Sequence, residues 1–267
     1  AGGISTGALS ATTGNIAVLA TGGAFTGTTV AARTGLVATA GQGLTLTSYA
    51  VTAGGATLSA GAPGLTLTSG TTTGNQTLTS AGSASLGNLT ASAGTLTATS
   101  SAGGLRYGTL SARGVHLTSG GLLAATTPST GVQGGAITST EVDPLDAIRV
   151  TAAQGQVSLG ALTATSGRVV VESTAGPLTT GNVTARAMSL DSGAGLSSGA
   201  LSATLGDVQL TARNGSVAYT SATASGRVTM AAQRTSGSTA TTTISGGAIT
   251  ARGTTALAGA PYTIDLS

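Results

Sequence analysis

Pairs of apolar residues separated by one position recur along the second half of the chain at a nearly constant interval. Four successive pairs follow one another at steps of 19, 20 and 20, and they are Val169/Val171, Met188/Leu190, Val208/Leu210 and Val228/Met230. Apolar residues at alternate positions are typical of a β-strand with one buried face. We therefore predict that one inward-facing column is made of Val169, Met188, Val208 and Val228.

Two further apolar signals lie between successive pairs. One is a single aliphatic residue and the other is a Gly-x-aliphatic triplet, and they fall at Leu178, Leu196 and Val217, and at Gly160/Leu162, Gly181/Val183 and Gly199/Leu201. Three short strands and Gly-rich turns in each unit of about 20 residues indicate a β-solenoid, in which one repeat forms one coil. The predicted fold class is all-β.

The first half of the chain carries the same signals with a less regular phase. The Leu44/Leu46 pair is followed by the equivalent Leu65/Leu67 pair at a step of 21. Helices are disfavoured because Gly, Thr and Ser occupy most positions and no helical apolar stripe persists. Three aliphatic residues continue the count through the middle of the chain at steps of 20 and 20, at Leu117, Ile137 and Val157. The repeat is therefore predicted to cross this region unbroken.

Residues 1–267 are predicted to form a single solenoid. Dividing 267 residues by about 20 gives roughly 13 coils. Strands about 4.8 Å apart would then build a rod some 60 Å long. Residues 121–148 contain Pro128, Pro144 and three of the seven acidic residues, which predicts a loop that leaves the rod. Residues 231–243 lose their aliphatics, which predicts a polar loop or a weak coil.

Composition narrows the possible partners. Only 6% of residues are charged, so the net charge of +3 reflects few carboxylates rather than a basic patch, and nucleic acid is not an expected partner. Cysteine is absent, which excludes disulfides and thiolate chemistry. No window approaches 18 uninterrupted apolar residues, so no membrane span is expected. No charged segment precedes an apolar one, and the chain starts at Ala1 without a Met, so we interpret it as a mature or excised piece of a larger protein.

Few residues suggest a metal or catalytic site. His116 is the one histidine, and its place between Val115 and Leu117 predicts an outward, bystander side chain rather than a member of a catalytic triad. A calcium ion could use the oxygen ligands of a small acidic cluster, although Asp-Pro is also a common turn opening. This cluster consists of Glu141, Asp143 and Asp146.

Parallel β-helices include many polysaccharide lyases and hydrolases, whose sites need clustered carboxylates and often aromatic platforms. Aromatic residues are only 2% of this chain, and its remaining acids are dispersed. Glu172 and Asp191 lie beside equivalent apolar pairs at a step of 19, so they are predicted to be solvated neighbours on one face. We expect no enzyme activity, no catalytic or cofactor-binding residues, no bound cofactor and no resident metal.

Threonine and arginine each show a partial regularity. Thr-x-Thr steps suggest the flat face of an ice-binding solenoid, but the predicted ladder does not persist, and Thr is in any case a favoured strand residue. These steps are Thr45/Thr47, Thr66/Thr68, Thr77/Thr79 and Thr95/Thr97. Four Arg residues follow small residues without a common period and are predicted to be solvated strand-end charges, at Arg113, Arg186, Arg213 and Arg252. Gly-Asn pairs begin at Gly14, Gly74, Gly87 and Gly181 and are predicted to form tight turns.

Repeat units of this length that are rich in Thr, Ser, Ala and Gly, with Leu-x-Leu and Gly-x-Leu signals, resemble the repeats of filamentous haemagglutinin-like proteins. The resemblance is carried by segments such as 87–96 (GNLTASAGTL) and 199–210 (GALSATLGDVQL). Such proteins are large exported adhesins and surface fibres of Gram-negative bacteria. The resemblance implies a right-handed parallel β-helix displayed on the cell surface or secreted.

The function expected from these observations is a non-enzymatic β-helical rod of a bacterial surface adhesin or extracellular fibre. The alternative is a subunit that polymerises end to end into a matrix filament, because each end of a solenoid presents an unpaired strand edge. Ile264→Pro should then block pairing at the C-terminal edge. A polysaccharide-processing β-helix enzyme and an ice-binding solenoid are weaker alternatives. The expected partners are another copy or flanking segments of a longer parent chain, bound at the rod ends, and a host or cell-surface receptor.

Overall fold

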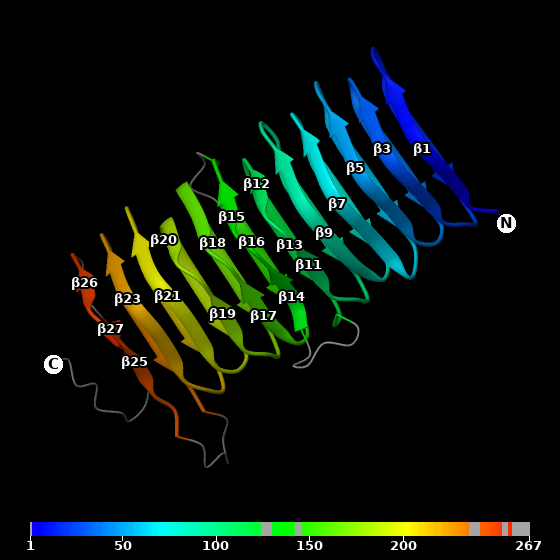
Figure 1. Ribbon diagram of the computed structural model, residues 1–267. Helices are drawn as coiled ribbons and strands as arrows, with labels where there is room; N and C mark the ends of the chain where they lie inside the picture. The colour runs from blue at the N-terminus through cyan, green and yellow to red at the C-terminus, as the bar shows by residue number, and fades with distance from the viewer. Residues whose placement is uncertain (1, 124–129, 142–145, 235–240, 253–255, 258–267) are drawn as a thin grey trace.

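The computed structural model describes residues 2–123, 130–141, 146–234, 241–252 and 256–257. Every regular element in these ranges is a β-strand, and all the pairings between turns are parallel. The strands form one 27-stranded sheet that winds as a β-solenoid with about 20 residues per turn (Figure 1). The predicted all-β solenoid and its period are confirmed.

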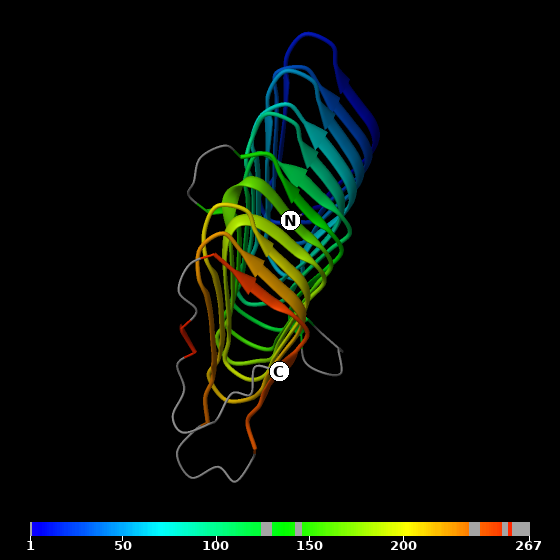
Figure 2. The ribbon, with the colours of Figure 1, turned by 90° about the vertical axis from the view of Figure 1, so that its left-hand side faces the viewer.

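The wall of the solenoid has two faces (Figure 2). We call the first the wide face, because in each turn its strand is long or is divided in two at a bend. It comprises β1 (Ile4–Ala11), β3 (Phe25–Ala32), β5 (Leu44–Val51), β7 (Gly64–Thr72), β9 (Ser83–Ala91), β11 (Leu105–Tyr107), β12 (Leu110–Ala112), β14 (Thr130–Gly134), β15 (Ile137–Ser139), β17 (Gln156–Leu159), β19 (Leu178–Thr180), β21 (Leu196–Ala203), β23 (Val217–Ala224), β25 (Ile244–Gly246) and β26 (Ile249–Ala251).

The second, narrow face carries one short strand per turn. Two strands, β18 and β20, begin on the wide face and end on the narrow one, and each pairs with partners on both faces. The strands are β2 (Asn15–Ala20), β4 (Gly35–Ala40), β6 (Gly55–Ala60), β8 (Gln76–Ser80), β10 (Leu96–Ser100), β13 (Val115–Ser119), β16 (Asp146–Ala152), β18 (Leu162–Ser173), β20 (Val183–Ser192), β22 (Val208–Ala212), β24 (Val228–Ala232) and β27 (Ala256–Leu257).

Residues that lie one repeat apart in the sequence are paired on successive turns of the solenoid. The four residues of the predicted column pair in order from β18 to β24, and each is at most 2% exposed: Val169, Met188, Val208 and Val228. The lone aliphatics and the Gly-x-aliphatic triplets of the same units also align, as Leu178 with Leu196 and Leu162 with Val183 show. Burial of these aliphatic columns between the two faces supplies the core.

Glycine is needed where successive turns come closest. A Cβ on Gly61 would overlap the carbonyl oxygen of Gly41, one turn earlier. Gly155, between β16 and β17, has φ of 73°, a conformation that L side chains rarely adopt. The Gly-rich turns are therefore what lets the chain bend at the edge of a thin core.

The expectation of roughly 13 coils is wrong, because the solenoid makes about 11 turns. Several turns are longer than the repeat: the step from Leu105 to its partner Val132 is 27, and that from Val115 to Ile148 is 33. A third long turn separates Val217 from its partner Ile244. With turns about 4.8 Å apart, the rod is about 50 Å long rather than 60 Å.

The predicted loop over 121–148 is also corrected. Strands β14 and β15 run through the middle of this range and pair with the turns before and after, with Val132 and Ile137 fully buried. Pro128, Asp143 and Pro144 lie outside the described residues. Farther along, β24 includes Ala231 and Ala232, and the described residues from 233 to 243 carry no strand, in agreement with the predicted polar segment.

The assignment of Leu117, Ile137 and Val157 to one continuing count is wrong. Leu117 lies on the narrow face in β13, whereas the other two lie on the wide face in β15 and β17, in different columns. Their equal spacing is a coincidence that arises because the turns in this region are lengthened. The repeat nevertheless crosses the region, since the pairings continue from β9 through β11, β14 and β17 to β19.

A buried serine column braces the turns that lead from the narrow face to the wide face. The hydroxyl of Ser100, fully buried, lies 2.8 Å from the carbonyl oxygen of Gly103 in its own turn and 2.6 Å from that of Gly82 in the previous turn. The same two-carbonyl arrangement recurs at Ser119, Ser173 and Ser192. Each buried hydroxyl therefore has two carbonyl oxygens within reach to which it can donate its one hydrogen bond.

The first described turn is less buried than the rest. Strands β1 and β2 pair within the described residues on one side only, with β3 and β4. Ile4 is 37% exposed, and Leu9, Ile16 and Val18 are half-buried although they occupy inward positions. Within the described residues, an apolar cross-section of the rod is therefore accessible at this turn. In the described part of the chain, no helix is long and apolar enough to cross a membrane.

Candidate functional site

The outward positions of the wide face form two columns of hydroxyl side chains. The first hydroxyl column follows the starts of the strands and is interrupted after five residues: Ser5, Thr26, Thr45, Thr66 and Ser85. The next two positions are Arg106 and Gln133, after which Ser158, Thr179 and Ser197 continue the column. Arg106 is the only charged outward residue on the described strands of the wide face.

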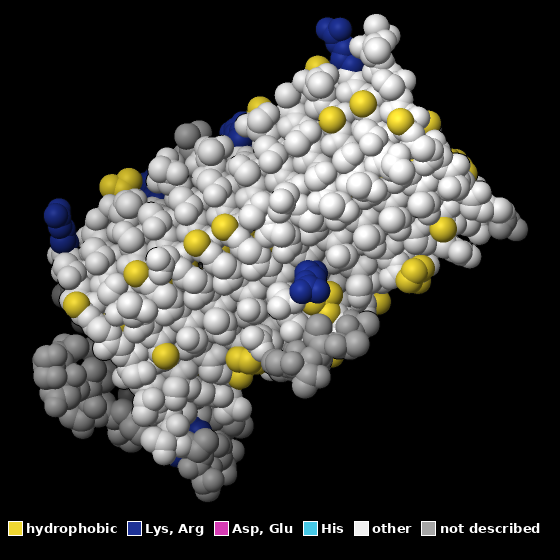
Figure 3. Space-filling view, in the orientation of Figure 1, with side chains coloured by type: hydrophobic (Ala, Val, Ile, Leu, Met, Phe, Trp, Pro, Cys, Tyr) yellow, Lys and Arg dark blue, Asp and Glu magenta, His cyan; other side chains and the backbone are white. Residues whose placement is uncertain are grey.

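The second hydroxyl column runs along the ends of the same strands. It is unbroken over nine turns: Thr71, Thr90, Ser111, Thr138, Thr163, Thr184, Ser202, Thr223 and Thr250. Figure 3 shows the resulting surface, on which basic side chains are few and widely separated and no acidic side chain is visible among the described residues. This surface offers hydrogen bonds along the rod axis with very little charge.

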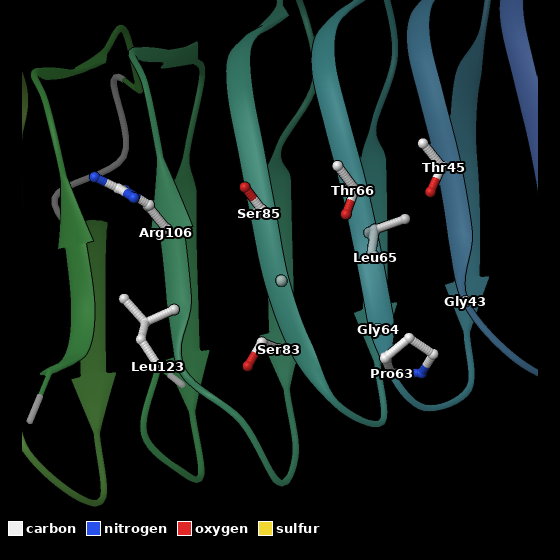
Figure 4. Close-up of a pocket in the computed structure, with 11 residues that line it drawn as sticks. Gly43, Thr45, Pro63, Gly64, Leu65, Thr66, Ser83, Ser85, Arg106 and Leu123 are labelled. Atoms are coloured by element: carbon white, nitrogen blue, oxygen red, sulfur yellow. The ribbon is translucent and has the colours of Figure 1, made fainter. Parts of the chain in front are cut away.

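A groove opens in the wide face around Arg106 (Figure 4). Its volume is about 330 Å³. Its lining includes three consecutive members of the first hydroxyl column, together with apolar and glycine residues. The lining residues are Gly43, Thr45, Pro63, Gly64, Leu65, Thr66, Ser83, Ala84, Ser85, Arg106 and Leu123. It is the clearest candidate for a ligand-binding surface among the described residues.

Sequence reasoning missed Arg106. The residue sits between Leu105 and Tyr107, which are both buried, so the alternation that identifies a strand also predicts an outward guanidinium. What the sequence could not reveal is that Pro63 and Leu123 lie on the same groove, because they come from different turns.

Charged residues instead gather on the narrow face. Glu172 and Asp191 pair in register on adjacent strands, as predicted, but they are not merely solvated neighbours. Arg213 forms an ion pair with Asp191 and lies 3.7 Å from Glu172. Its hydrogen bond to Asp191, together with the charge of that residue, raises the pKa of the Arg213 guanidinium. A bridging cation thus relieves the repulsion between the two carboxylates.

Arg113 and Arg213 are exposed, as predicted, but each also forms an ion pair. Arg113 pairs with Glu141 at 2.9 Å, and Arg213 bridges the two acids of the narrow face. Their partners lie one or more turns away, so no period in the sequence marks the pairs.

The structure does not bring the acidic residues proposed for calcium together, because two of them pair with different Arg residues. Glu141 pairs with Arg113, and Asp146 pairs with Arg149 at 2.7 Å. Asp143 lies outside the described residues. Within the described ranges, no three acidic or histidine side chains gather in a way that could hold a metal ion.

His116 points outward from β13, as predicted. Its Nε2 lies 3.0 Å from the backbone carbonyl oxygen of Asp146, which can only accept a hydrogen bond. The carboxylate of Asp146 is held by Arg149. The described residues therefore place neither a carboxylate nor a serine hydroxyl in a hydrogen bond with the His116 ring.

The Thr-x-Thr steps fall on different faces. Thr45 and Thr66 belong to the wide face, whereas Thr77, Thr79 and Thr97 belong to the narrow face. A regular array does exist on the narrow face, but it spans three turns: Thr57/Ser59, Thr77/Thr79 and Thr97/Thr99. The next outward pair contains His116, and later ones contain Glu172 and Asp191. The expectation that the ladder does not persist is correct, although only one of the four steps named in the sequence, Thr77/Thr79, lies wholly in this array.

Three of the Gly-Asn pairs have a shared structural role. The side-chain oxygens of Asn75, Asn88 and Asn182 each accept a hydrogen bond from a backbone N–H one turn later, at 2.9 to 3.0 Å. Asp207 does the same at 2.7 Å. These side chains tie successive turns together, which explains them without a ligand.

Comparisons of the chain with protein-family models, with curated proteins and with solved structures gave no match.

Proposed function

We propose that the chain is a structural, non-enzymatic β-helical rod of a bacterial surface adhesin or extracellular fibre. The observation that carries the proposal is the uninterrupted parallel pairing from the first described turn to the last, which makes an elongated body with repetitive polar sides. An enzyme needs an acid, a base or a nucleophile brought together in a pocket. In the described residues four of the five acids are instead paired with Arg, and the fifth, Asp207, accepts a hydrogen bond from a backbone N–H.

Composition and repeat pattern support an extracellular role. The absence of Cys is compatible with export by a route that does not depend on oxidative folding, and the Thr-, Ser- and Gly-rich units resemble those of filamentous haemagglutinin-like proteins. A solenoid extends by adding turns without enlarging its core, so it is suited to holding a binding surface away from a cell.

Cell-surface labelling tests this proposal. Antibody raised against the purified rod should label intact cells of the source organism or their extracellular matrix, and protease treatment of intact cells should remove the signal. Labelling that appears only after the cells are permeabilised would contradict it. Incubation of the purified chain with a panel of polysaccharides should release no new sugar ends, and release abolished by His116→Ala or Glu172→Gln would identify an enzyme.

A subunit that polymerises end to end is the second candidate, favoured by the accessible cross-section at β1 and β2. Half-buried Ile16 and Val18 lie beside backbone groups that have no strand partner on their outer side within the described residues. Another copy could extend the sheet there. Electron micrographs at rising protein concentration should then show filaments, and Ile16→Asp should shorten them while most of the rod stays folded. Ile264, the residue whose substitution was expected to block the opposite edge, lies outside the described ranges.

A further inference from the structure

The groove around Arg106 combines three kinds of surface that a structural rod does not need together. Arg106 is exposed at one end of it, three hydroxyl side chains lie along it, and Pro63 and Leu123 contribute apolar contact area. These side chains come from five neighbouring turns (Figure 4).

The hydroxyl side chains define the axis along which a ligand would lie. Thr45, Thr66 and Ser85 pair in register on β5, β7 and β9, and Arg106 is the next residue of the column, on β11. Neighbouring strands are about 4.8 Å apart, so the four side chains offer polar groups at regular intervals along the rod axis. A hydroxyl can both donate and accept, so it matches another hydroxyl without a fixed polarity. The complementary ligand is a linear chain rich in hydroxyl groups.

Arg106 makes the groove selective for a ligand with a negative charge. A guanidinium presents a planar fork of donors that fits a carboxylate in a bidentate arrangement. No described acidic residue forms an ion pair with Arg106, so its guanidinium is available to a ligand. Because it is the only charged outward residue on the described wide face, the groove does not provide the several cations that a densely sulfated chain would need.

We propose that this groove binds a linear acidic polysaccharide that carries carboxylate groups at low charge density. A uronate carboxylate pairs with Arg106, neighbouring sugar hydroxyls bond to Ser85 and Thr66, and the C–H faces of the sugar rings pack on Pro63 and Leu123. This inference goes beyond the proposed structural role and does not depend on it, since a purified rod can be tested for binding whatever its location in the cell.

Binding of hyaluronan oligosaccharides, in which each uronate alternates with an uncharged sugar, to the purified chain tests the proposal, with titration calorimetry as the measurement. The wild-type chain should bind the uronate oligomer more tightly than a neutral glucan oligomer of equal length. Arg106→Gln should weaken uronate binding at least tenfold, and Thr66→Val should weaken it by a smaller factor. The matched control is Arg33→Gln, which removes another exposed arginine that does not line the groove and should leave binding unchanged.

Circular dichroism confirms that each variant is folded before it is titrated. Absence of uronate binding by the folded wild-type chain would overturn the proposal. Equal losses in the Arg106 and Arg33 variants would also overturn it, because they would indicate non-specific attraction to a cationic protein. Tighter binding of heparin fragments than of hyaluronan oligosaccharides would contradict the predicted low charge density. Failure of this test would leave the surface-labelling experiment for the rod unaffected.

Discussion

The ring of Tyr107 lies over Gly134, its register partner in the following turn. Any Cβ at Gly134 would overlap the ring carbons of Tyr107. The same relationship recurs for Tyr49 with Gly70 and for Tyr219 with Gly246. A large ring in a thin core thus requires a residue without a side chain in the next turn, which explains why Gly70 and Gly134 interrupt otherwise aliphatic columns.

Substitution of Gly134 tests this relationship. Gly134→Ala should destabilise the rod by about 1–3 kcal/mol, because the added methyl overpacks the core against Tyr107. Gly35→Ala is the matched control, since the nearest atoms to its added Cβ lie at 3.8 Å, an ordinary contact. Denaturant unfolding measures both changes. The double variant Tyr107→Leu/Gly134→Ala should recover part of the loss, and an equal loss in both backgrounds would contradict the explanation.

Tyr107 and Tyr49 should respond oppositely to loss of the hydroxyl group. The Tyr107 hydroxyl is buried without a hydrogen-bond partner among the described residues, so Tyr107→Phe should leave stability unchanged or raise it by about 1 kcal/mol. The Tyr49 hydroxyl donates to Gln76 Oε1 at 2.9 Å, and Tyr49→Phe leaves that buried oxygen without this donor. This substitution should lower the free energy of unfolding by about 1 kcal/mol. A gain from both substitutions, measured by thermal unfolding, would contradict the assignment.

The same two tyrosines predict a loss of stability at alkaline pH. Burial raises the pKa of both hydroxyls above the ordinary value of 10.0, since the charged phenolate is disfavoured in the core. The unfolded chain therefore releases protons above pH 10 while the folded chain retains them, and stability falls as the pH rises further. The double variant Tyr49→Phe/Tyr107→Phe should show a smaller fall. Unfolding curves measured from about pH 8 to about pH 12, about two units on either side of the ordinary pKa, would reveal it, and an identical fall in the double variant would contradict the cause.

Val208 provides a test of the column that the sequence predicted. Val208→Asp places an unpaired charge between Met188 and Val228, and it should cost at least ~3 kcal/mol. Gln209→Asp, at the adjacent exposed position, should change stability by less than about 0.5 kcal/mol. Hydrogen exchange should show lost protection in β20 and β24 but not in β4. Uniform loss along the whole rod would mean that the turns do not open locally.

The accuracy of the sequence prediction depended on the length of each turn. Leu44 and Leu65 pair as predicted at a step of 21, because their turn contains no insertion. Between Val115 and its partner Ile148 the step is 33, so counting by 20 led from Leu117 to a residue on the other face. A period defines a column only where every turn has the same length, and apolar alternation looks alike on both faces.

The groove was less predictable than the fold for a related reason. Alternation places Arg106 outward, but the three-dimensional neighbours of a residue on a solenoid lie one or two turns away, at separations that insertions alter. Leu123 reaches the groove from the first of the lengthened turns. The ion pair of Arg213 with Asp191 has the same origin, since it joins adjacent turns at a separation of 22 residues that is not the strand period.

The last prediction concerns the buried serine column. Ser100→Ala removes a hydroxyl that lies within 2.8 Å of two carbonyl oxygens, so it should destabilise the rod by about 1 kcal/mol. The smaller side chain itself fits, because alanine occupies the same column at Ala60 and Ala152. The loss of stability in Ser100→Ala therefore measures the lost hydrogen bond rather than the creation of a cavity.

Ser189→Ala, at an outward position of β20, is the control and should change stability by less than about 0.5 kcal/mol. Hydrogen exchange locates the effect: amides of residues 101–104, in the turn that Ser100 braces, should exchange faster in Ser100→Ala than in the wild type. Unchanged exchange in that turn, together with a normal melting temperature, would show that neighbouring backbone pairings hold the turn without the serine. The equivalent serines, such as Ser119 and Ser192, would then have no bracing role either.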